Sequence, residues 1–212
     1  NVTRIAKRFL MLTLEQMEER KNQVGASDVY YLLNFDNKKP KDLWLEKIGR
    51  KEMTFFENIY TRAGNIVEEP CLVHYLEPFK EPYTLGERIE HKYIKRFVSS
   101  TDGLVNGVPV ENKTIKAENY KENMMNKQYY TQLQAQIACT NADKGIILYN
   151  LLEAEDYEHP LLYEPKQFVH VYKRDNELIE EIESRVRYFL RCMDNEIEPN
   201  EKDYGDYCGK EK

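Results

Sequence analysis

The sequence predicts an α/β (α+β) fold in which a mixed central sheet is flanked by helices, with a helix-rich N-terminal third. Helical periodicity fills the first part of the chain, and segments with strand character alternate with helical ones in the second half. The pair Asn106-Gly107 lies between two runs with strand character, which is a strong hairpin signal. Hydrophobic residues make up 41% and charged residues 32% of the 212 residues, as expected for a globular chain with one core.

The N-terminal third is expected to be helical. Residues 3–23 show a charged amphipathic pattern with apolar side chains near one face. A break at residues 25–28 follows, in which Ser27 is a good N-cap for a short helix. Pro40 is well placed at the start of a third helix, and a fourth helix spans about 54–77.

Strands are expected in the middle of the chain. Residues 88–98 alternate well enough for one strand, and the hairpin around Asn106-Gly107 comes next. The remaining predicted elements are a helix from about 118 to 141, a buried strand at 145–149, a strand near 167–173 and a helix from about 175 to 194. We therefore predict a single domain over residues 1–198 and a flexible acidic tail over residues 199–212.

Composition excludes several classes of site. The net charge of −6 argues against a protein that only coats nucleic acid by neutralising phosphates. None of the four cysteines lies within two to four residues of another, so zinc-ribbon and iron–sulfur spacing is absent. Scattered single cysteines are typical of reduced thiols and predict an intracellular protein. The four histidines form no HxH or HExxH pattern.

The hairpin places three charged side chains on one face of the sheet. A two-residue turn at Asn106-Gly107 pairs residue 105 with residue 108, and by the same register Asp102 lies opposite Glu111. Lys113 shares the face of Glu111 because side chains alternate along a strand. Two facing carboxylates destabilise a sheet unless a cation lies between them, and Mg²⁺ prefers such oxygen ligands, with Mn²⁺ as a substitute.

This constellation suits phosphodiester hydrolysis. The ammonium of Lys113 is placed to hold or deprotonate a water or to stabilise charge as the phosphorus is attacked. The spacing alone is a weak signal in a chain this rich in charge, and a solvated hairpin with surface charges explains it slightly better than a metal site does. The alignment of the three residues by the Asn-Gly turn makes the two explanations about equal.

The pattern Asp102…Glu111-x-Lys113 resembles the PD-(D/E)xK nuclease superfamily, with Thr101 where a proline usually precedes the aspartate. Other stretches narrow the resemblance to the lambda-type exonucleases, the YqaJ viral recombinase family. They are an arginine followed by GASD within 20–28, LWLEKIG within 41–49, GNIVE at 64–68 and QLQ at 132–134. The resemblance covers about residues 20–150, in the order of the family, and implies a restriction-endonuclease-like fold.

The resemblance assigns roles to single residues. Glu68, Asp102 and Glu111 are implied as metal ligands, with the backbone carbonyl of Asn112 as a further one. Lys113 is implied as the catalytic lysine, and Gln132 as a residue that orients the site. Arg20 and Ser27 are implied to bind the terminal 5′ phosphate of DNA or a nearby backbone phosphate.

Each assignment has a plain structural alternative. Glu69 is adjacent to Glu68, so a slip of one residue stays open. Gln128, Gln132 and Gln136 also fit the solvated stripe of a helix. Ser27 is explained by helix capping, and Arg20 by the charged surface of the first helix.

The resemblance implies a Mg²⁺-dependent exonuclease that resects double-stranded DNA from 5′ to 3′ in recombination, repair or viral DNA processing. It also implies homo-oligomers, commonly trimeric rings around DNA, and a single-strand annealing protein as a partner. An endonuclease or Cas4-like end-processing nuclease on the same core is an alternative, although the iron–sulfur cysteines of the latter are missing. A catalytically inactive module that binds DNA ends is the non-enzymatic alternative.

Overall fold

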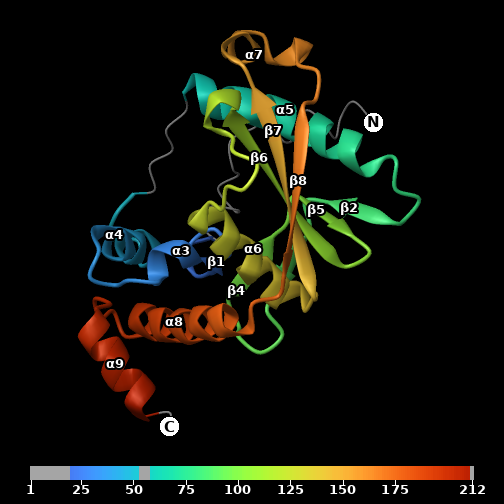
Figure 1. The fold of residues 1–212 in the computed structure, drawn as a ribbon. Helices are drawn as coiled ribbons and strands as arrows, with labels where there is room; N and C mark the ends of the chain where they lie inside the picture. Colours follow the sequence, from blue (N-terminus) through green and yellow to red (C-terminus); the bar gives the residue numbers. More distant parts are fainter. Residues whose placement is uncertain (1–19, 53–57, 211–212) are drawn as a thin grey trace.

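The computed structural model describes residues 20–52 and 58–210 (Figure 1). Most of the helix predicted over residues 3–23, and the start of the one predicted over 54–77, lie outside the described residues. Where the chain is described, the structure confirms a mixed α/β architecture with strands in its middle and helices around them. No described helix is long and apolar enough to cross a bilayer.

The larger sheet has five strands in the order β2-β5-β6-β7-β8. Its strands are β2 Tyr83–Leu85, β5 Gly103–Val105, β6 Val108–Lys116, β7 Lys144–Leu152 and β8 Gln167–Lys173. Strands β6 and β7 are parallel, and the other neighbouring pairs are antiparallel. The sheet is therefore mixed, and its longest strands, β6 and β7, lie in its interior, between β5 and β8.

A second, smaller sheet has the order β1-β4-β3, with β1 Val24–Gly25, β4 Phe97–Ser100 and β3 Arg88–Glu90. The prediction of one strand over 88–98 is wrong, because the chain reverses between β3 and β4. Arg96 adopts a left-handed φ of 68° in this turn. The buried His91 Nδ1 accepts the N–H of Ile94 at 3.2 Å and stabilises the reversal. Alternating hydrophobicity does not reveal such a local hydrogen bond.

The N-terminal helices are α3 Val29–Leu32, α4 Lys38–Lys47 and α5 Ile59–Leu76. The prediction of Ser27 as the N-cap is wrong by one residue, since Asp28 precedes α3 and its carboxylate accepts the N–H of Gly25 at 2.9 Å. Helix α4 begins two residues before Pro40, which lies in its first turn. Asn58 caps α5 through the N–H groups of Tyr60 and Thr61.

The C-terminal helices are α6 Lys127–Thr140, α7 Ala154–Glu158, α8 Asn176–Asp194 and α9 Glu201–Lys210. Helix α6 is shorter than the predicted 118–141, because Asn126 caps it and a short 3₁₀ turn occupies 117–119. The segment predicted as a flexible tail forms α9. Its first residue, Glu201, accepts a hydrogen bond of 2.6 Å from the Arg185 guanidinium on α8, which holds the segment in place.

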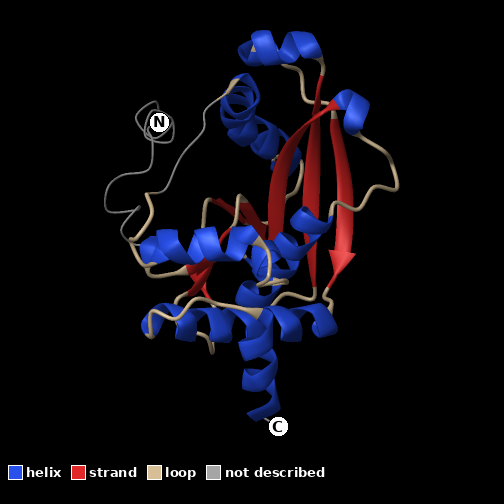
Figure 2. Ribbon diagram, turned by 90° about the vertical axis from the view of Figure 1, so that its left-hand side faces the viewer, coloured by secondary structure: helices blue, strands red, loops and turns tan. Residues whose placement is uncertain are grey.

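The core lies in separate layers around the larger sheet. One cluster joins α3, α4 and α8, and Phe35 contacts the rings of Tyr188 and Phe189 there. Helix α6 packs Leu133 and Ile137 against β7, whereas α5 packs Leu72 and Leu76 against Val110 and Leu148. Figure 2 shows the long strands side by side, with α8 crossing below their ends. Helices α5 and α6 therefore cover opposite faces of the sheet.

Gly145, at the start of β7, sets the distance between α6 and the sheet. A Cβ at this position would lie 2.7 Å from Cδ1 and 2.9 Å from Cγ of Leu133, which is fully buried. We expect Gly145→Ala to lower the free energy of unfolding by about 1–3 kcal/mol, because a packed core resists an added methyl group. Urea unfolding of the two proteins measures this change, and equal midpoints would contradict it.

Candidate active site

The β5–β6 hairpin has the predicted turn and register. Asn106 and Gly107 have φ values of 48° and 80°, as a type I′ turn requires. Val105 pairs with Val108, Leu104 with Pro109 and Gly103 with Val110. Asp102 and Glu111 directly follow the Gly103–Val110 pair. The predicted register is therefore confirmed for the three pairs between the turn and these two residues.

Asp102 lies where β5 separates from β6. Strand β6 continues to Lys116, but its pairing with β5 ends at Val110. Beyond that point the Asp102 Oδ2 atom accepts the backbone N–H of Asn112 at 2.8 Å. The carboxylate therefore lies at the edge of β6, directly before the first residue of β5.

Glu111 is the centre of a dense hydrogen-bond network. Its side chain is 2% exposed and forms an ion pair with the Nζ atom of Lys113. The Gln132 Nε2 atom donates to Glu111 Oε1 at 2.6 Å, and the Gln136 Nε2 atom donates to Glu111 Oε2. Both glutamines come from α6, which presents successive turns to the same carboxylate.

The interpretation of these glutamines as a solvated stripe is wrong. Gln136 is fully buried, and Gln132 and Gln128 are partly buried. Gln128 donates to the Tyr31 hydroxyl at 3.3 Å instead of reaching the acidic site. Gln136 is a site residue that the sequence interpretation missed, although its spacing of four residues from Gln132 was the available signal.

The charges of the site interact strongly. Burial, followed by the charges of Glu111 and Glu68, raises the pKa of Asp102 well above its usual range. Burial alone would lower the pKa of Lys113, but the carboxylates of Glu111 and Asp102 raise it above its usual value. Negative charge is therefore in excess at this edge of β6, and Lys113 remains an ammonium at neutral and moderately alkaline pH.

Glu68 approaches the same charges from α5. It is among the principal charges acting on both Asp102 and Lys113. Its backbone carbonyl accepts the Asn112 Nδ2–H at 2.6 Å, which fixes this turn of α5 on β6. One turn earlier, Gly64 faces the side chain of Thr114. The structure thus places the GNIVE segment beside the hairpin.

The donor set suits a hard divalent cation in kind. Asp102, Glu111 and Glu68 offer only carboxylate oxygens, which are the ligands that Mg²⁺ and Mn²⁺ take. Within residues 20–52 and 58–210, no three acidic, histidine or cysteine side chains stand close enough together to hold an ion as arranged. Both Glu111 oxygens are engaged by Lys113 and the glutamines, so a cation would compete with the Lys113 ammonium for this carboxylate.

Arg20 and Ser27, the predicted phosphate-binding residues, are both exposed. The buried Lys47 donates to the Arg20 carbonyl oxygen at 2.9 Å and forms an ion pair of 3.0 Å with Asp28. Lys47 belongs to the LWLEKIG segment and Asp28 to GASD, so this ion pair joins the two segments. Helix α3 has four residues, which is too short to supply an anion site through its N-terminus.

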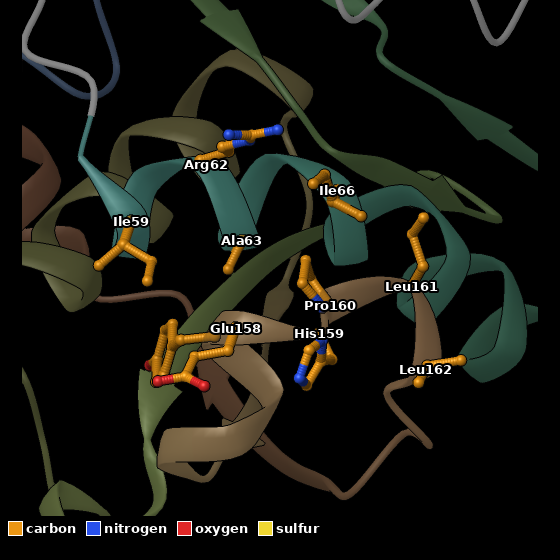
Figure 3. A pocket seen from close by; sticks show the side chains of 10 residues that line it. Ile59, Arg62, Ala63, Ile66, Glu158, His159, Pro160, Leu161 and Leu162 are labelled. Carbon is orange, nitrogen blue, oxygen red and sulfur yellow. The ribbon is translucent and has the colours of Figure 1, made fainter.

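A separate cavity of about 470 Å³ lies between the start of α5 and the segment that follows β7 (Figure 3). Its lining includes apolar side chains of Ile59, Ala63 and Leu161, together with Arg62 and His159. None of the acidic hairpin residues lines it. The cavity is therefore distinct from the acidic cluster at the edge of β6, which consists of Asp102, Glu111 and Glu68.

Known structures share this architecture. An alkaline exonuclease from Laribacter hongkongensis, LHK-Exo, has been solved in complex with dAMP. That structure superposes with a TM-score of 0.70 at 25% identity, over 88% of this chain and 95% of that one. A second LHK-Exo structure gives a TM-score of 0.69 at 23% identity, over 94% and 100% of the two chains. A phage-related exonuclease from Haemophilus somnus 129PT gives 0.63 at 15% identity, over 82% and 94%.

Sequence comparison gives the family. No curated protein matches the chain. The profile of the YqaJ-like viral recombinase domain matches residues 16–143, which span the GASD, LWLEKIG and GNIVE segments, the hairpin and helix α6. The matched region carries every residue of the acidic cluster at the edge of β6. This chain is therefore a member of the YqaJ-like viral recombinase family.

Proposed function

We propose that this protein is a Mg²⁺-dependent deoxyribonuclease, active also with Mn²⁺, that digests double-stranded DNA from its 5′ ends. The observation that carries the proposal is the convergence of Asp102, Glu111 and Lys113 at one edge of β6, with Gln132 and Gln136 holding Glu111. The similarity to LHK-Exo, an alkaline exonuclease solved with dAMP, supports a nucleotide product.

Different residues would bind the metal ion, orient its ligands and stabilise charge during the reaction. Asp102 and Glu111, with Glu68 beside them, would hold the cation, and the backbone carbonyl of Asn112 is a further candidate ligand. A bound divalent cation supplies Lewis-acid polarisation of the phosphate and lowers the pKa of water. Gln132 and Gln136 fix the Glu111 carboxylate in one orientation. Lys113, being protonated, stabilises negative charge as the phosphorus is attacked.

The biological setting follows from the family. A member of a viral recombinase family that resects 5′ ends would deliver single strands to an annealing protein during DNA recombination, repair or viral DNA processing. We propose a homo-oligomer, a trimeric ring by family resemblance, as the working form on DNA. An intracellular protein is consistent with the four unpaired cysteines.

Circular DNA separates the exonuclease from its alternatives. The proposed enzyme should degrade linear duplex DNA and leave covalently closed circular duplex intact, because it requires an end. An endonuclease on the same core would cut both substrates. A catalytically inactive end-binding module would bind the linear duplex without Mg²⁺-dependent cleavage of either.

Arg20 provides a test of recognition of the 5′ end. A terminal phosphate carries more charge than an internal one, and the guanidinium fork binds it with paired hydrogen bonds. We expect the wild type to digest 5′-phosphorylated ends faster than 5′-hydroxyl ends, and Arg20→Ala to remove most of this preference. Initial rates on both ends measure it, with Arg20→Lys as the control that keeps the charge without the fork. Equal wild-type rates on both ends would contradict this role.

A further inference from the structure

Three side-chain carboxamides lie on the sheet face covered by α5, and two of them are buried while the third is half-buried. They belong to Asn112 on β6, Asn150 on β7 and Gln167 on β8. The Gln167 Nε2 atom donates to Asn150 Oδ1 at 2.9 Å, and the Asn150 Nδ2 atom donates to Asn112 Oδ1 at 2.6 Å. Asn150 is 0% and Asn112 3% exposed. We call this chain of side chains the amide relay.

Both ends of the amide relay are bound to the backbone of α5. Asn112 donates to the Glu68 carbonyl at 2.6 Å, and Gln167 donates to the Cys71 carbonyl at 2.8 Å. Pro70 lies between these two residues and has no N–H, so the α5 ladder lacks one hydrogen bond at this turn. The amide relay therefore attaches α5 to three strands at the turn that contains Pro70.

Asn112 also connects helix α5 to the carboxylate of Asp102. Its backbone N–H donates to Asp102 at 2.8 Å, while its side chain holds the Glu68 carbonyl. Its two neighbours in sequence, Glu111 and Lys113, point to the other face of the sheet. One residue thus contacts the two chain segments that bring Asp102 and Glu68 to the cluster.

An apolar side chain is the ordinary choice for the interior of such a sheet. Buried amides are costly unless each is hydrogen-bonded, and a fully bonded network makes the arrangement rigid and unique. The bonds of Asn112 and Asn150 meet this condition in the structure. A role in fixing the position of Glu68 accounts for three amides at this place in the sheet.

We propose that Asn112, Asn150 and Gln167 are positioning residues that hold Glu68 at the metal site, and that Asn112 is the link between Glu68 and Asp102. The proposal rests on the proposed function, since it concerns the same site. Glu68 rather than Glu69 is the upstream acidic residue in this proposal, because the charge of Glu68 acts on both Asp102 and Lys113.

Metal binding by the metal-free protein tests the amide relay without relying on catalysis. Asn112→Leu keeps the branching of the side chain at Cγ and the N–H to Asp102, but removes the bonds to Glu68 and Asn150. We expect it to weaken Mn²⁺ binding, measured by calorimetry, about 10–100-fold, as supporting residues of metal ligands do. Gln167→Met should weaken binding in the same direction by a smaller factor, because it acts through Asn150 and Cys71.

Controls separate positioning from general damage. Val169→Thr changes a 42% exposed residue on the same face of β8 as Gln167 and should leave Mn²⁺ affinity unchanged. Asn112→Leu combined with Glu68→Gln should bind no more weakly than Glu68→Gln alone, because both changes remove the same ligand. Amide hydrogen exchange of the metal-free Asn112→Leu variant should be faster in α5 around Glu68 than in the wild type.

The outcomes are distinguishable. Folded Asn112→Leu and Gln167→Met variants with wild-type Mn²⁺ affinity would overturn the amide relay and leave the proposed function standing. If Asn112→Leu fails to fold, the Mn²⁺ affinity of Gln167→Met, whose substitution lies on the edge strand β8, decides whether the amide relay stands. A wild-type protein that binds no Mn²⁺ would overturn the proposed function and the relay together.

Discussion

Replacing Asp102 with asparagine is expected to abolish DNA cleavage while making the protein more stable. Burial and the charges of Glu111 and Glu68 raise the pKa of Asp102, so the ionised carboxylate is less favourable in the folded than in the unfolded chain. At pH 8 a neutral amide removes this penalty, and its oxygen can still accept the Asn112 N–H. We expect Tm to rise by about 2–4 °C for each kcal/mol removed. Activity should fall at least about 100-fold, since even supporting residues of metal ligands cost 10–100-fold.

Differential scanning calorimetry and a nuclease assay on the same preparation measure both effects. Asp206→Asn, an exposed substitution in α9, is the matched control and should change neither. Glu111→Gln should also abolish cleavage but lower Tm, because Lys113, Gln132 and Gln136 all direct hydrogen-bond donors at the Glu111 carboxylate. An Asp102→Asn variant with wild-type turnover would refute its role as a ligand.

Replacing Lys113 with methionine is expected to lower kcat about 10²–10⁴-fold, the range of a positioned group acting in the transition state. DNA affinity should change little, because the ammonium is paired with Glu111 in the absence of DNA. The pKa of Lys113 is raised above its usual value by Glu111 and Asp102, so the side chain acts as a cation. Lys113→Arg, which keeps the charge, should retain more activity than Lys113→Met.

Single-turnover rates and fluorescence anisotropy with labelled duplex separate the two effects. Lys144→Met, an exposed change on the adjacent strand β7, serves as the control for loss of one positive charge. A loss of DNA affinity with an unchanged single-turnover rate would make Lys113 a phosphate contact and remove it from the chemistry.

Short-range signals in the sequence predicted the hairpin on which the candidate site is built. The Asn106-Gly107 turn fixes its own register, because a type I′ turn requires a positive φ at both residues, and the register carries Asp102 and Glu111 to one place. Strand β8 was predicted near residues 167–173, where it is found, for a similar reason, since its pattern lies within one continuous run. Family resemblance added Glu68 and Gln132, which no local pattern identifies.

Interactions between distant parts of the chain set the limit of prediction. The amide relay depends on contacts between residues that are 38 positions apart in one case and 17 in the other. The local pattern around Asn112 does not predict these contacts. The burial of Gln136 depends on the distance of α6 from the sheet, which Gly145 sets. The tail predicted after Pro199 forms a helix, because Arg185 and the aromatic residues of α8 supply partners for it.

Nucleotide release from linear duplex DNA labelled at its 5′ ends tests the central claim most directly. The account predicts mononucleotides from the wild type in the presence of Mg²⁺, none after chelation with EDTA, and none from the Asp102→Asn variant under either condition. Release that persists in EDTA, or that the Asp102→Asn variant performs at the wild-type rate, would contradict a metal-dependent site at the edge of β6.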